Sequence, residues 1–85
     1  MNYVVDWTTG PVVTLAALWQ DYKDLRQEIT TAQAEIDRVL ARDPLGHGVH
    51  ISEGLYALEK HPLRVLFEIS EHDRLVTVTS VGLLV

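Results

Sequence analysis

The hydrophobic pattern of this chain changes from helical to alternating near residue 45. In residues 25–40, apolar side chains recur every three or four positions, which is the spacing of one face of a helix. In residues 63–70 they alternate in the way typical of a half-buried strand. A chain whose helices come early and whose strands follow one another at its end is expected to be an α+β protein. Its helices should cover one face of an antiparallel sheet.

The predicted order of elements is strand, helix, helix, strand, strand, strand. The helices are expected at residues 11–20 and 25–40. We expect them to form an antiparallel helical hairpin, with a single bent helix as the alternative. The strands are expected at residues 2–7, 55–60, 63–70 and 75–85. The sequence thus predicts a mostly antiparallel four-stranded sheet with the hairpin on one face, and the glycine-rich residues 47–54 are expected to be a loop.

Length and charge limit the function classes. With 85 residues the chain is predicted to be a single domain, residues 1–85. Its 12 acidic and 7 basic residues give a net charge of -5, which argues against a general nucleic-acid binder because such proteins need a basic surface. The chain has no cysteine and no apolar run long enough to span a bilayer. We therefore expect a cytoplasmic protein that does not contact membranes.

Metal and cofactor sites are not indicated by the sequence. His47 and His50 lie three positions apart, but a metal site needs at least one more ligand, which His61 or Glu53 would have to supply. The chain also lacks a glycine-rich phosphate loop and a nucleophile motif. We therefore expect neither a metal nor a cofactor.

The strand at residues 63–70 has two different faces. The face expected to meet the helices consists of Leu63, Val65, Phe67 and Ile69. The opposite face holds Arg64, Leu66 and Glu68, and the last strand adds Leu84, with Val76 as the alternative. Because exposed apolar groups in a small domain often mark an interaction site, these four residues are the predicted partner-binding surface. The alternatives are two-sided burial for Leu84 and, for Arg64, an exposed ion pair with Glu59 or Glu68.

Three segments have sequences typical of one family. The first strand ends in Trp7-Thr8 and is followed by Leu18-Trp19 in the first helix; residues 36–45 read IDRVLARDPL, and residues 62–69 read PLRVLFEI. In this order, the segments resemble the RelE/ParE toxin superfamily of bacterial type II toxin–antitoxin modules. The resemblance covers nearly the whole chain.

The resemblance implies a toxin that binds a cellular target and that an antitoxin neutralises by wrapping around it. RelE-type members cleave messenger RNA in the ribosomal A site, whereas ParE-type members poison DNA gyrase. The resemblance alone does not choose between the ribosome with its RNA and gyrase as the target. The alternative is a non-catalytic protein-interaction module on the same scaffold, either a degenerate toxin or a homodimer.

Catalysis by the RelE-type members uses basic residues on the sheet, together with arginine and tyrosine near the end of the last strand and beyond it. Here Arg64 matches the basic position on the central strand, while residues 81–85 contain neither arginine nor tyrosine. Cleavage also needs a group that accepts a proton, and His61 beside Lys60 is the candidate for that role. The catalytic candidates are therefore Arg64 and His61, and the acidic charge of the chain argues against ribonuclease chemistry.

Overall fold

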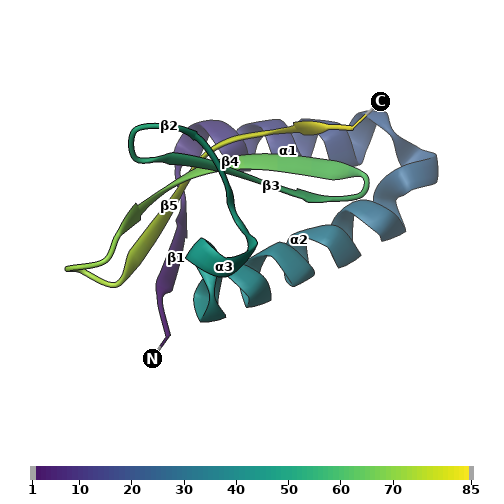
Figure 1. Ribbon diagram of the computed structural model, residues 1–85. Coiled ribbons are helices and arrows are strands. Elements are labelled where there is room, and N and C mark those ends of the chain that lie inside the picture. Colours follow the sequence, from purple (N-terminus) through teal and green to yellow (C-terminus); the bar gives the residue numbers. More distant parts are fainter. Residues whose placement is uncertain (1, 85) are drawn as a thin grey trace.

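The computed structural model describes residues 2–84, which form a five-stranded sheet and a pair of long helices (Figure 1). Along the chain the elements are β1 (Val4–Trp7), α1 (Thr9–Asp21), the 3-10 helix η1 (Lys23–Leu25), α2 (Arg26–Arg42), α3 (Pro44–His47), β2 (Val49–Ser52), β3 (Leu55–Lys60), β4 (Leu63–Ser70) and β5 (Leu75–Leu83). The strand order in the sheet is β1-β5-β4-β3-β2. β1 runs parallel to β5, and the other neighbouring strands are antiparallel.

The two long helices form the predicted hairpin rather than one bent helix. α1 and α2 run in opposite directions on either side of η1 (Figure 1). The helical spacing of α2 places its buried side chains in one stripe, which consists of Ile29, Ala32, Ile36, Val39 and Leu40. No helix within residues 2–84 combines the length and the apolar composition that crossing a membrane requires.

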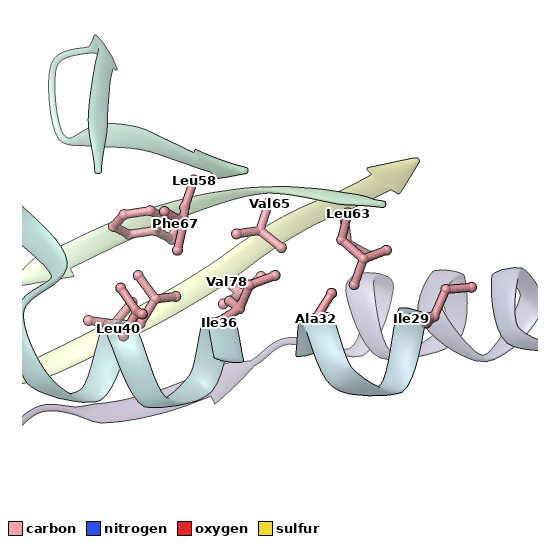
Figure 2. Close-up of a cluster of buried hydrophobic side chains, with 12 residues drawn as sticks. Ile29, Ala32, Ile36, Leu40, Leu58, Leu63, Val65, Phe67 and Val78 are labelled. Carbon is pink, nitrogen blue, oxygen red and sulfur yellow. The ribbon is translucent and has the colours of Figure 1, made fainter. Parts of the chain in front are cut away.

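The hydrophobic core lies between α2 and the central strands. Figure 2 shows Ile36 and Leu40 of α2 pointing toward Val65 and Phe67 of β4. Leu63, Val65 and Phe67 on the helix-facing side of β4 are fully buried, as the alternating pattern predicts, and Ile69 near the end of the strand is half-buried. At the edge of the core, the indole Nε1 of Trp7 donates a hydrogen bond of 2.6 Å to Asp37 Oδ1, which fastens β1 to α2.

The predicted count of four strands and the predicted loop at residues 47–54 were wrong, because part of that segment is β2. Val49-His50-Ile51-Ser52 alternates apolar and polar side chains, and Gly54 has φ +75, so residues 53–54 turn the chain back into β3. The high glycine content of this region concealed a short edge strand. Val85, the predicted end of the last strand, lies outside the described residues.

α3 is a second element that was not predicted, and only its last residue, His47, falls in the expected loop. Pro44 stands at its start, where a proline is tolerated because the first helical N–H groups have no intrahelical partner. The Asp43 carboxylate caps this single turn by accepting a 3.0 Å hydrogen bond from the Gly46 N–H. A cap and a proline are thus sufficient for one helical turn between α2 and β2.

Gly48 joins α3 to β2 at a place where the chain passes very close to the core. A Cβ atom at this position would lie 2.7 Å from Phe67 Cζ and 2.8 Å from the Pro44 carbonyl oxygen, so backbone atoms would have to move. Gly48→Ala should therefore reduce the free energy of unfolding by about 1–3 kcal/mol.

The matched control is Gly10→Ala in the first turn of α1, where a Cβ atom would meet nothing within 4 Å. This change should be neutral or stabilise the protein by up to about 1 kcal/mol, because alanine is the better helix former. Urea denaturation of both variants checks the pair. Equal effects at the two glycines would contradict the close approach at Gly48.

Candidate functional site

Leu66 lies near the centre of the sheet face that is turned away from the helices, which we call the open face. Its neighbours on the adjacent strands are Ala57 of β3 and Ser80 of β5. Val49 of β2 pairs with Ala57 in turn, so three apolar side chains form a row across β2, β3 and β4. Ala57 is 4% exposed, Leu66 is half-buried and Val49 is 65% exposed. The apolar row is therefore most accessible at the β2 edge.

Arg64 lies beside this row on β4. Its Nε is 3.5 Å from Oε2 of Glu59, which is its partner on β3. The two side chains are 42% and 59% exposed, so water screens the pair and it contributes only about 0–1 kcal/mol. The structure thus selects Glu59, and among residues 2–84 no ion pair joins Arg64 to Glu68. An incoming carboxylate or phosphate would have to compete with Glu59 for this guanidinium.

Carboxylates outnumber Arg64 on the open face. On the other side of Leu66, Glu68 of β4 pairs with Thr77 of β5, and Thr77 pairs with Asp6 of β1. Glu68 and Asp6 are both exposed, as is Glu59. Three carboxylates therefore share this face with Arg64, and such a surface disfavours the approach of a polyanion.

A hollow of about 350 Å³ opens where the open face meets the β2 edge. Its lining consists of His47, Val49, Ile51, Ala57, Leu58, Glu59 and Arg64. Val49 and Ile51 are large apolar side chains that remain 65% and 47% exposed on an edge strand. Sequence reasoning missed both residues, although their alternation with His50 and Ser52 before the turn at residues 53–54 is the signal that could have found them.

The structure does not bring the two catalytic candidates together. His61 is exposed in the turn between β3 and β4, and among the described residues no hydrogen bond or ion pair joins it to Arg64. Leu84 is half-buried beside the same turn, where its N–H donates a 2.8 Å hydrogen bond to the Pro62 carbonyl oxygen. Leu84 therefore lies at the end of the sheet, whereas Arg64, Leu66 and Glu68 share the middle of the open face.

The two histidines of the 47–54 segment contact different neighbours. His47 Nδ1 is 3.8 Å from the Asp43 carboxylate and 3.1 Å from the Asp43 carbonyl oxygen. The His50 ring instead meets the Tyr56 ring edge to face, at 5.5 Å between centroids. Within residues 2–84, no group of three or more histidine, aspartate or glutamate side chains is arranged to hold a metal ion.

The fold has a counterpart among solved structures. No protein-family model and no curated protein sequence matches the chain. The crystal structure of the toxin–antitoxin complex RelBE2 from Mycobacterium tuberculosis does match, with a TM-score of 0.81 and 20% sequence identity. The match covers 98% of this chain and 92% of the matched chain. This chain therefore has the fold of a chain in that complex, which agrees with the fold that the sequence resemblance implied.

Proposed function

We propose that this chain is the toxin component of a type II toxin–antitoxin module, which binds a target in the cytoplasm and is neutralised by an antitoxin. The observation that carries this proposal is the RelE-type fold, shared over 98% of the chain with part of a toxin–antitoxin complex. Binding the target and being neutralised by an antitoxin share one requirement, which is a surface that a protein partner can cover.

The open face is the proposed contact surface for a protein partner. Its predicted residues are Arg64, Leu66, Glu68 and Leu84, and the structure extends the apolar part to Val49 and Ile51 at the β2 edge. Covering these apolar side chains would remove them from water, which favours binding. Arg64 adds specificity because a partner carboxylate can replace Glu59 and accept two hydrogen bonds from its guanidinium.

The same surface is poorly suited to RNA. Phosphate binding depends on lysine and arginine side chains, and the charge stabilisation needed for cleavage has the same source. On the open face, the carboxylates of Asp6, Glu59 and Glu68 accompany the one guanidinium that we place there, and Glu59 lies 3.5 Å from it. We therefore propose that the chain acts on its target by binding, without cleaving RNA.

Induced expression in a bacterial host tests the proposal directly. With no antitoxin present, the wild-type chain should stop growth within a few generations, and an empty vector should not. The measurement needs a parallel check that the chain is soluble and folded, for example by purification and circular dichroism. Unimpaired growth in the presence of folded protein would contradict a toxin and would favour the non-catalytic interaction module instead.

A further inference from the structure

Helix α1 is apolar on nearly all sides, although little of it is buried. Residues 9–20 contain no charged side chain. Within α1 only Pro11 is buried, while Leu15 and Leu18 are half-buried against the core. A helix of this composition is normally enclosed by protein on every side. The exposed side of α1 is therefore apolar enough to be covered by protein, but within residues 2–84 nothing covers it.

The uncovered side of α1 forms a groove with α2. The groove has a volume of about 350 Å³ and is lined by Val12, Leu15, Ala16, Trp19, Gln20, Ile29, Thr30 and Gln33, all of them uncharged. Val12 is 50% exposed, and its neighbour Val13 on the outer side of the helix is 62% exposed. The side chains contributed by α1 thus form an uncharged and mostly apolar strip that extends from Val12 to Gln20.

Trp19 is held in place within this groove. Its Nε1 donates a 3.3 Å hydrogen bond to Thr30 Oγ1 on α2. The Arg26 guanidinium lies over its ring at 4.2 Å, and Arg26 Nε donates a 2.7 Å hydrogen bond to the Trp19 carbonyl oxygen. The indole is still 44% exposed. A fixed, exposed tryptophan loses little side-chain entropy on binding and is typical of the residues that dominate interfaces.

We propose that the groove and outer side of α1 are the interface with a second copy of this chain. Each copy carries a net charge of -5, so the repulsion between two copies is smallest where they meet through a surface without carboxylates. Residues 9–20 provide such a surface, which also offers no electrostatic attraction to a basic partner. This inference goes beyond the toxin proposal and does not depend on it.

The sequence of α1 is suited to a twofold axis. In an antiparallel pair of α1 helices crossing at Ala16, the small alanine side chains allow the two backbones to approach. Residues equally distant from Ala16 then face each other, so Val13 lies opposite Trp19 and Val12 lies opposite Gln20. A large aromatic ring therefore meets a small β-branched side chain at both ends of the contact.

The size of the surface predicts a weak dimer. At 1.5 Å per residue, α1 is about 20 Å long, and two adjacent helices are about 20 Å wide. The patch is thus roughly 400 Å² per copy, or about 800 Å² for the pair, which is smaller than the roughly 1,200 Å² that stable specific interfaces bury. We expect association in the micromolar to millimolar range.

Sedimentation and light scattering across these concentrations test the interface. The wild-type mass should rise from 9.6 kDa toward twice that value as concentration increases. Ala16→Glu places two carboxylates at the twofold axis and should weaken association at least tenfold. Thr31→Glu is the matched control, because Thr31 is exposed on α2 but does not line the groove. Circular dichroism should show that both variants remain folded, since glutamate is a good helix former.

A mixture of two variants distinguishes a self-interface from any other contact. Ala16→Glu and Ala16→Lys should each be monomeric alone, and mixing them in equal amounts should restore association by pairing opposite charges at the axis. A wild-type chain that stays monomeric at millimolar concentration would overturn the proposal. So would an Ala16→Glu chain that associates as tightly as the wild type, or a mixture that stays monomeric.

Discussion

Replacing Phe67 by alanine is expected to remove about 3–5 kcal/mol of folding free energy, which is the largest loss that we predict for a single side chain. Phe67 is 0% exposed on β4, and its ring stacks on Tyr56 at 5.8 Å between centroids. Gly48 lies close to the Cζ tip of the ring, so the backbone on that side is already close-packed. Since a domain of this size has a total stability of only about 5–15 kcal/mol, the variant should be largely or partly unfolded at moderate temperature.

Urea denaturation followed by circular dichroism, at one fixed protein concentration, measures this loss. Tyr22→Ala is the control, because it also truncates an aromatic side chain but one that is 47% exposed. The control should lose less than about 1 kcal/mol, as exposed substitutions usually do. Similar losses for the two variants would contradict a core centred on the helix face of β4.

Replacing Leu66 by glutamine is expected to raise the inducer concentration that halves the growth rate at least tenfold, while leaving the protein folded. Leu66 is half-buried at the centre of the open face, between Ala57 and Ser80, where a bound partner would cover it completely. Glutamine would remove apolar contact with the partner. Its side-chain amide would also be buried under the partner without a group to hydrogen-bond with. The few residues that dominate an interface cluster near its centre and each contributes about 2 kcal/mol or more, whereas a tenfold loss of affinity requires only about 1.4 kcal/mol.

Leu45→Gln is the matched control for this prediction. It is the same substitution at a leucine that is 44% exposed on α3 and does not line the hollow beside the open face. The inducer concentration that halves the growth rate should rise for Leu66→Gln and should stay unchanged for Leu45→Gln. If Leu66→Gln stopped growth as efficiently as the wild type, the open face would not be the surface that binds the target.

The elements with a strong period could be predicted from the sequence. α2, β3 and β4 lie close to their expected ranges, because a long apolar stripe or a strict alternation determines which face is buried. β2 and α3 were not predicted, because α3 is a single turn without a period and the short alternation of β2 lies among glycines that indicate a loop. Their existence depends on the Asp43 cap and the Gly54 turn, whose effect is local.

The candidate site could be predicted only in part. Alternation placed Arg64, Leu66 and Glu68 on one face correctly, since the side chains of a strand point to opposite sides in turn. It could not reveal that Glu59 is the residue paired with Arg64, or that Asp6 shares the face, because both depend on the register between strands. The role of these residues in partner binding stays a prediction.

Transcript mapping during induced growth arrest tests most directly the claim that the chain acts by binding and not by cleaving RNA. Primer extension on abundant messages should show intact transcripts in cells that have stopped growing, because three carboxylates share the open face with Arg64. New 5′ ends within coding regions, present with the wild-type chain and absent with Arg64→Ala, would contradict the account. They would show that the open face is a ribonuclease centre despite its acidic charge.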